Sequence, residues 1–202
     1  MVLRICSLCS LWLLVGAISA HAQVFPQVRA NFEQGRVFEA NFEHVYIDSY
    51  TKESLSSTGK IWVSADKYRL ESEGQLLIVD GETSKVYDQA KNRVIISDYS
   101  EDEDDFAPSR MLKGVDSTYV IDEERQENGH MKIIMETEDD FALYVKVEIL
   151  VDANAHPISI TAYDFSENVI VTTFKNGKFI DKKEDLFVLR YPKDAEIVDT
   201  RY

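Results

Sequence analysis

Beyond the first 22 residues, the side chains best suited to acid–base or metal chemistry in this sequence are three histidines, His44, His130 and His156. They lie far apart and form none of the HxxxH, HxH or HExxH spacings that bring two imidazoles to one metal ion. The sequence also contains no Gly-x-Ser-x-Gly elbow and no glycine-rich phosphate loop. Carboxylates are so numerous that a close pair would arise in any fold. We therefore predict a protein that is not an enzyme and uses no metal or cofactor.

The first 22 residues have the pattern of a cleavable secretory signal peptide. Arg4 precedes an apolar run at 8–18, and the small-residue sequence Ala-His-Ala follows at 20–22. The run is short for a membrane span, and no second run follows it. Cys6 and Cys9 both lie in this segment, so we expect the processed protein to have no disulfide, thiol nucleophile or lipid-modified cysteine.

We expect residues 23–202 to form one soluble periplasmic domain, which is long enough for a sizeable core. The whole sequence contains 22 Lys and Arg against 36 Asp and Glu, a formal net charge of −14. This charge argues against nucleic acid and anionic membrane surfaces as partners, and it favours a basic protein partner. We expect the protein to be a monomer.

One short helix followed by many strands is predicted after the signal peptide. Phe25, Val28 and Phe32 recur at helical spacing, and beyond Gly35 apolar residues alternate with polar ones as in half-buried strands. The predicted strands are 38–47, 61–63, 68–71, 76–79, 85–87, 94–97, 119–124, 131–136, 142–151, 157–165 and 169–175. Turns are predicted at Ser56-Ser57, Ala65-Asp66, Glu73-Gly74, Asp80-Gly81, Lys91-Asn92, Asn128-Gly129 and Asn154-Ala155. Such short connections predict a single, mainly antiparallel sheet.

A sheet of this many strands cannot leave its apolar face in water. Only short helices are available to cover it: the one before Gly35, and a second that Pro108 and Gly114 delimit. The sheet therefore either folds over into a closed core or curls around an apolar cavity that the helices cap. Alternation alone leaves both possibilities open, because most apolar strand faces are simply core.

Five motifs occur in a fixed order along the chain. They are Ala40-Asn41-Phe42-Glu43-His44; Gly59-Lys60-Ile61-Trp62-Val63 with Tyr68-Arg69; Leu76-Leu77-Ile78-Val79-Asp80-Gly81-Glu82-Thr83 with Tyr87-Asp88; Ala107-Pro108 before Met111-Leu112; and Phe187-Val188-Leu189-Arg190-Tyr191-Pro192. In this order behind a signal peptide, they resemble the LolA family of periplasmic outer-membrane lipoprotein carriers. The resemblance covers nearly all of the chain after the signal peptide.

The resemblance implies an incomplete antiparallel barrel with short helices as a lid over an apolar cavity. It also implies that the cavity takes lipoprotein acyl chains from a release complex at the inner membrane and yields them to an outer-membrane acceptor. The candidate cavity positions come from the resemblance or, for those between 145 and 160, from a shared inward parity along the strands, and they fit ordinary core packing as well. They are Trp62, Tyr68, Leu70, Leu77, Val79, Met111, Leu112, Val145, Val147, Ile149, Ile158 and Ile160. Asp80 and Gly81 are interpreted as structural, with the Asp side chain capping its own turn.

One motif of the family is missing. Well-studied members have an Arg-Pro pair after the tryptophan strand, and that Arg holds the lid shut, whereas this chain has Ser64-Ala65-Asp66. Opening is therefore controlled differently, or the cargo differs. The acidic run from Glu101 to Asp105 either docks a basic partner or is a solvated loop. Two alternatives to a lipoprotein carrier remain open: a carrier of another lipid, and an envelope sensor or regulator on the same half-barrel.

Overall fold

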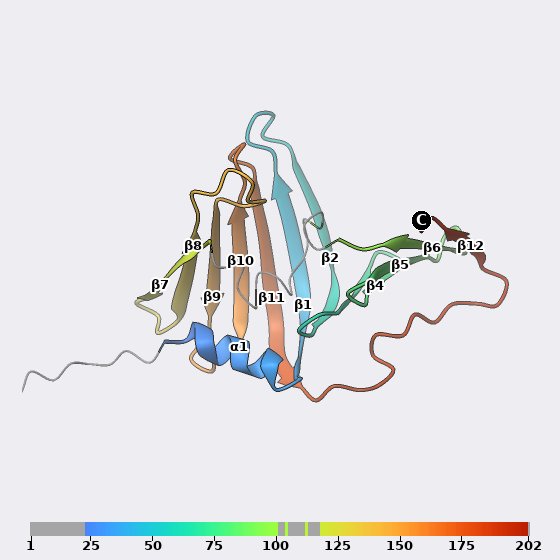
Figure 1. Cartoon of the computed structure of the whole chain (residues 1–202), viewed down its shortest axis with the longest axis horizontal. Coiled ribbons are helices and arrows are strands. Elements are labelled where there is room, and N and C mark those ends of the chain that lie inside the picture. The colour runs from blue at the N-terminus through green and yellow to red at the C-terminus, as the bar shows by residue number, and fades with distance from the viewer. Residues whose placement is uncertain (1–22, 101–103, 105–111, 113–117, 202) are drawn as a thin grey trace, which may run out of the picture.

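The structure is a computed structural model that describes residues 23–100, 104, 112 and 118–201. Twelve strands form one sheet, and one helix lies across it near one end of the strands (Figure 1). The elements are α1 (Phe25–Glu33), β1 (Val37–Ile47), β2 (Ser54–Val63), β3 (Tyr68–Ser72), β4 (Gln75–Val79), β5 (Thr83–Asp88), β6 (Arg93–Asp98), β7 (Val120–Arg125), β8 (Met131–Glu136), β9 (Lys146–Val151), β10 (Pro157–Tyr163), β11 (Val169–Ile180) and β12 (Glu196–Asp199).

The strand order across the sheet is β12-β6-β5-β4-β3-β2-β1-β11-β10-β9-β8-β7. The order has two ends, so the sheet curves without closing into a barrel. Neighbouring strands are antiparallel except for β12, which runs parallel to β6. The prediction of a mainly β, incomplete barrel is confirmed. Strand β12 was not predicted, and its parallel pairing departs from the expected antiparallel pattern.

Helix α1 follows directly from its sequence. Phe25, Val28 and Phe32 are its buried residues, and they lie on one stripe because their spacing is three and four. A proline in the first turn costs the helix no hydrogen bond. The helix gives way at Gly35, whose φ of 75° lies in the left-handed region that glycine adopts without strain. In the part of the chain that the structure describes, no helix is both long and apolar enough to cross a membrane.

Two glycines allow the long central strands to lie close to neighbouring atoms. A Cβ on Gly59 of β2 would lie 1.9 Å from the carbonyl oxygen of Glu71, and a Cβ on Gly177 of β11 would lie 2.7 Å from the Phe38 ring. Both contacts are shorter than side-chain carbons tolerate, so only glycine fits there. The register of β1 against β11 also shifts between Glu39 and Asn41, and such a bulge increases strand twist.

One predicted turn is wrong. Ser56 and Ser57 pair with Val45 and His44 inside β2, and the chain reverses earlier, at residues 48–53. Two serines suggest a turn by composition, but the long register of β1 against β2 overrides that local preference. The turns predicted at Glu73-Gly74 and Asn128-Gly129 are confirmed.

Three predicted features lie outside the described residues. They are the signal peptide at 1–22, the helix between Pro108 and Gly114 apart from Leu112, and the acidic run from Glu101 to Asp105 apart from Asp104.

Candidate functional site

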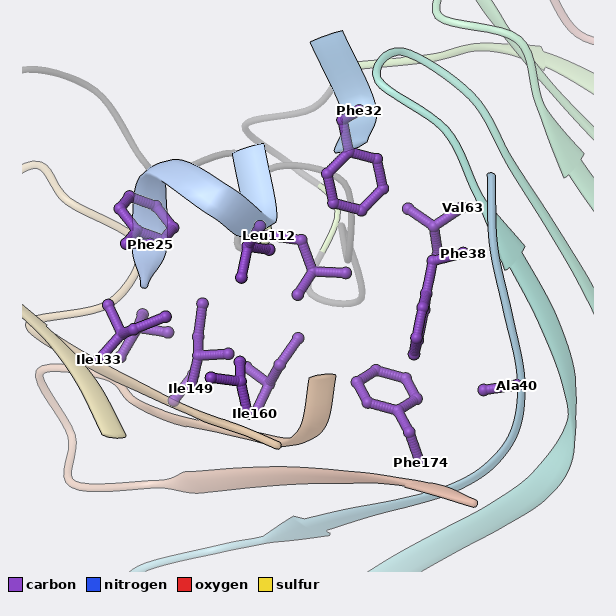
Figure 2. Close-up of a cluster of buried hydrophobic side chains, with 14 of the residues drawn as sticks. Phe25, Phe32, Phe38, Ala40, Val63, Leu112, Ile133, Ile149, Ile160 and Phe174 are labelled. Atoms are coloured by element: carbon purple, nitrogen blue, oxygen red, sulfur yellow. The ribbon is translucent and has the colours of Figure 1, made fainter. Parts of the chain in front are cut away.

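One face of the sheet, here called the inner face, carries a continuous cluster of buried apolar side chains (Figure 2). Its members on the strands are Phe38, Ala40, Phe42, Ile61, Val63, Tyr68, Val79, Ile133, Met135, Val147, Ile149, Val151, Ile160, Ala162, Ile170, Phe174 and Phe179. The buried stripe of α1 joins the cluster, and so does Leu112. Leu112 lies among the helix and sheet side chains in Figure 2. This arrangement buries the apolar face of the sheet under a helix rather than under a second sheet.

Aromatic rings fill the part of the inner face where α1 ends. The Phe38 ring lies 5.3 Å from Phe174 and 5.4 Å from Phe179 between ring centroids. Phe32 of α1 lies edge-on to Phe179 at 5.3 Å. Such edge-to-face pairs add stability beyond the burial of apolar area. They join the helix to the two central strands, β1 and β11.

Polar contacts hold α1 at its two ends. At its start, the backbone N–H groups of Val24 and Phe25 donate to the Glu123 carboxylate of β7, at 2.7 and 2.8 Å. These are N–H groups that the helix itself leaves without partners, and a carboxylate is favoured there. Beyond its end, Arg36 donates to the carbonyl oxygen of Phe179 at 2.8 Å. The helix is therefore fixed at both ends by polar contacts and along its length by apolar ones.

The structure brings most of the predicted cavity residues together on the inner face. Tyr68, Val79, Leu112, Val147, Ile149 and Ile160 belong to the buried cluster, and Leu70 and Leu77 pack against it. Neighbouring strands align several of them, because Tyr68 pairs with Val79 and Ile149 pairs with Ile160. Their position on one apolar face is thus observed, whereas their contact with a ligand remains a prediction.

Four predicted residues are placed differently or not at all. Trp62 lies on the opposite face of the sheet, here called the outer face, between residues that point inward. Ile158 is half-buried at a bulge where the register of β10 against β9 shifts, so it loses the parity of Ile160. Val145 is half-buried just before β9. Met111 lies outside the described residues.

Tyr68 combines apolar contacts with one strong hydrogen bond. Its hydroxyl donates to the Asp104 carboxylate at 2.6 Å, and its ring lies edge-on to Tyr99 at 6.5 Å. Burial, and next the charge of Asp104, raise the pKa of Tyr68 far above its ordinary value, so the hydroxyl keeps its proton. One residue of the acidic run is therefore tied to the inner face. Neither sequence interpretation of that run included this contact.

Sequence reasoning missed a polar pair among the apolar side chains of the inner face. His44 and Thr172 are opposite each other on β1 and β11, and His44 Nδ1 lies 2.9 Å from Thr172 Oγ1. They share the parity of Phe42 and Phe174, which point inward. Alternation on β1 was the available signal, because it places His44 two residues after Phe42.

The predicted role of Asp80 is confirmed. Its carboxylate accepts hydrogen bonds from the backbone N–H of Thr83 at 2.9 Å and from Lys85 Nζ at 2.6 Å. Burial alone would raise the pKa of Asp80, but the Lys85 and Thr83 hydrogen bonds outweigh it and lower the pKa well below its ordinary value. Asp80 therefore acts as a charged turn cap.

Two surface hollows flank the edge strand β7. One has a volume of 580 Å³ and is lined by Gln23, Phe25, Pro26, Arg29, Ile121, Asp122, Glu123, Arg125 and Met131. The other has a volume of 680 Å³ and is lined by Thr118, Val120, Glu136, Thr137, Glu138, Val145 and Lys146. Phe25 belongs to the inner cluster and Met131 packs against it, so the first hollow adjoins the inner face where α1 begins.

The three histidines lie in separate places. His44 is paired with Thr172, His130 lies near Asn128 in a turn, and His156 Nδ1 lies 3.1 Å from the Asp152 carboxylate. Among the described residues, no three His, Cys, Asp or Glu side chains gather in a way that could hold a metal ion.

The comparisons with known proteins concern the fold. No family model matches the sequence, and no curated protein matches it. An uncharacterized conserved protein from Thermus thermophilus is similar in structure, with a TM-score of 0.54 and 17% identity over 88% of this chain and 99% of that one. At this identity the likeness shows a shared fold and nothing finer.

Two further similar structures carry descriptive names. One is a putative outer membrane lipoprotein-sorting protein domain from Vibrio parahaemolyticus, 12% identical over 82% of this chain and 94% of that one, with a TM-score of 0.43. The other is a LolA superfamily protein from Nitrosomonas europaea, 12% identical over 83% of this chain and 99% of that one, also with a TM-score of 0.43. LolA superfamily proteins are thus among the structural neighbours of the chain.

Proposed function

We propose that this protein is a periplasmic carrier that binds the acyl chains of lipoproteins, or of another lipid, on its inner face beneath α1. It acts without covalent chemistry, as a monomer, and moves its cargo from a donor complex at the inner membrane to an acceptor at the outer membrane. The observation that carries the proposal is the continuous apolar face of an open sheet, on which the short helix α1 and Leu112 pack among the residues that the structure describes.

Binding on this face requires an exchange of apolar contacts. The protein's own side chains already fill this face. The completely buried members of the cluster include Val28 of α1 and Ile133, Val147 and Ile149 of the sheet. An acyl chain enters by replacing the stripe of α1 on the sheet. Each methylene of the cargo that leaves water contributes about 0.8 kcal/mol, which offsets part of the free energy of the lost helix contacts.

The contacts of α1 support such an exchange. Its start depends on Glu123 of the edge strand, and its end depends on Arg36 and the Phe32 ring. All three are reversible, noncovalent contacts near the ends of a short helix. The hollow of 580 Å³ lies beside its first turn and has a mixed lining, in which Phe25, Ile121 and Met131 are the apolar contacts at which an alkyl chain would start. Moderate affinity also suits a carrier, which must release its cargo.

Paired glutamate substitutions on β3 and β4 test the proposal. Leu70→Glu places a charge on the inner face, whereas Leu76→Glu places the same charge on the outer face of the adjacent strand, and both leucines are half-buried. We expect Leu70→Glu to reduce the affinity for a triacylated lipopeptide and for an apolar fluorophore at least tenfold, because a charge is excluded from an apolar site. Leu76→Glu should bind both ligands like the wild type.

Circular dichroism and the denaturant midpoint must show that both variants are folded. Equal binding by the two folded variants and the wild type would reject the inner face as the lipid site. Mass spectrometry of material that elutes with the protein from its native periplasm then distinguishes a lipoprotein from another lipid. Lipid-independent binding of a signalling protein, with no affinity for either ligand, would instead indicate an envelope sensor.

A further inference from the structure

Three loops at one end of the sheet display apolar side chains to solvent. Tyr50 in the β1–β2 turn is 93% exposed, Phe141 in the β8–β9 loop is 98% exposed, and Phe165 in the β10–β11 turn is 53% exposed. Leu55, just beyond the first turn, is 73% exposed. Figure 1 shows these three connections together at the end of the sheet that lies away from α1. Large apolar side chains this exposed on neighbouring loops indicate an interaction surface.

Each of the three loops is built by the same device. Asp48, Asp139 and Asp164 each accept a hydrogen bond from the backbone N–H two residues further along, at 2.9, 3.0 and 2.8 Å. Such aspartate turns fix the local backbone. In every case the exposed aromatic residue follows the aspartate by one or two positions, so the turn itself holds the ring outward.

Hydrogen bonds also join the loops to one another. The Ser49 N–H donates to Asn168 Oδ1 at 2.8 Å, and the Ser49 hydroxyl donates to the carbonyl oxygen of Ser166. The Val145 N–H donates to the carbonyl oxygen of Tyr163 at 2.8 Å, which connects the β8–β9 loop to the end of β10. The exposed rings are therefore presented by a connected framework, which lowers the entropic cost of binding a partner.

Charge decides what kind of partner fits this end. The segments 48–53, 138–141 and 164–168 contain seven acidic residues and one lysine, a net charge of −6. An anionic lipid surface attracts basic segments and repels acidic ones, so insertion of these rings into an anionic bilayer is disfavoured. Aromatic anchors surrounded by acidic residues instead complement a protein surface that has apolar pockets and a basic rim.

We propose that this end of the sheet, with Tyr50, Phe141 and Phe165 as anchors, docks a partner protein that presents lysine or arginine residues around apolar pockets. The inference is independent of the proposed lipid binding, because it uses residues on loops away from the inner face. These loops lie at the other end of the strands from α1 and the hollow beside it.

Site-specific photo-crosslinking in the producing cells tests this inference with the full-length chain. A benzophenone amino acid replaces Tyr50 or Phe141, and a control replaces Ile197 of β12, which is 54% exposed and lies at the far edge of the sheet. We expect both loop positions to crosslink to one and the same protein, through a peptide that contains lysine or arginine. We expect no such product from the Ile197 control.

A charge reversal sharpens the test. Glu138→Lys with Asp140→Lys should reduce the crosslinked product roughly tenfold, because complementary charge governs the encounter rate. The same variant should bind the apolar fluorophore like the wild type, which separates this inference from the proposed function. Adducts with phospholipid, adducts with a second copy of the chain, equal products from Ile197, or no product would each overturn the inference. So would flotation of the purified protein with phosphatidylethanolamine–phosphatidylglycerol vesicles that depends on Phe141.

Discussion

Trp62 and Phe38, which lie on opposite faces of the sheet, are buried in different ways. On the outer face, the Trp62 indole N–H donates to the Glu39 carboxylate at 2.7 Å, and Lys60 and Arg69 lie over the ring at 4.6 and 5.3 Å from the ring centroid. On the inner face, the Phe38 ring packs against the Phe174 and Phe179 rings. Charged partners need fixed geometry, whereas apolar contacts can be exchanged for those of a ligand without leaving a polar group unpaired.

An irregular segment of the chain, rather than a helix, packs on the outer face among the described residues. Arg69 donates to the carbonyl oxygen of Leu186 at 3.3 Å, so the irregular segment before β12 crosses this face. The rings of Tyr87 and Tyr191 lie 6.4 Å apart. These contacts join distant parts of the chain by polar and aromatic pairs. The outer face is thus secured by polar and aromatic pairs, whereas the proposed exchange concerns the apolar contacts of the inner face.

Phe38→Ala should have the largest effect on stability. The ring is completely buried between two others, so its removal costs about 3–5 kcal/mol in transfer and cavity free energy. Chemical denaturation followed by circular dichroism measures this loss. The cavity is on the inner face, so a saturating apolar ligand should restore part of the lost stability and raise the denaturation midpoint of the variant. A ligand that leaves the midpoint of this variant unchanged would count against an exchangeable inner face.

Trp62→Phe should have an intermediate effect. The substitution keeps an aromatic ring but removes the N–H that binds Glu39, and a lost hydrogen bond to a charged group costs about 1.5–3 kcal/mol. The comparison predicts unchanged lipid affinity and no rescue by an apolar ligand, as measured by the same denaturation and fluorophore assays. Reduced lipid affinity in the folded variant would show that the outer face takes part in binding.

Glu39→Gln should have the smallest effect, about 1 kcal/mol at neutral pH, and the effect should depend on pH. Burial alone would raise the pKa of Glu39, but the Trp62 hydrogen bond and the charges of Lys60 and Lys178 lower it below its ordinary value. A carboxyl group with a lowered folded-state pKa stabilises the protein above its unfolded pKa, and this contribution is lost as pH falls through the folded pKa. The stability difference between variant and wild type should therefore be constant from pH 7 to 6 and shrink below about pH 4. A difference that stays the same at acid pH would contradict the charged network.

The sequence patterns predicted the elements better than the faces. Strict alternation at Phe38, Ala40 and Phe42 located β1, and helical spacing of Phe25, Val28 and Phe32 located α1, because both patterns record burial on one side. Strand β12 was missed because it has only four residues, too few for a clear alternation pattern, and it pairs with β6, which is distant in the sequence. Ser56-Ser57 misled for a related reason, since only the long pairing of β1 with β2 specifies a strand there.

The candidate site was predictable where alternation was regular. Tyr68, Leu70, Leu77 and Val79 share the inner face because β3 and β4 pair without a shift. Ile158 was not predictable in this way, because a bulge in β10 breaks the parity between it and Ile160. The face on which Trp62 lies could not be predicted without its neighbours. Glu39 and Arg69 become neighbours of Trp62 only through strand pairing.

Nuclear magnetic resonance of isoleucine methyl groups, during titration with a spin-labelled stearic acid, tests the central claim most directly. Ile133, Ile149 and Ile160 lie in the inner cluster, and Ile78 is equally buried but lies on the outer face beside Arg69. We predict strong, saturable broadening of the three inner methyl signals and an unchanged Ile78 signal. Broadening of Ile78 to the same extent, or no saturable broadening of the inner three, would contradict an acyl site on the inner face.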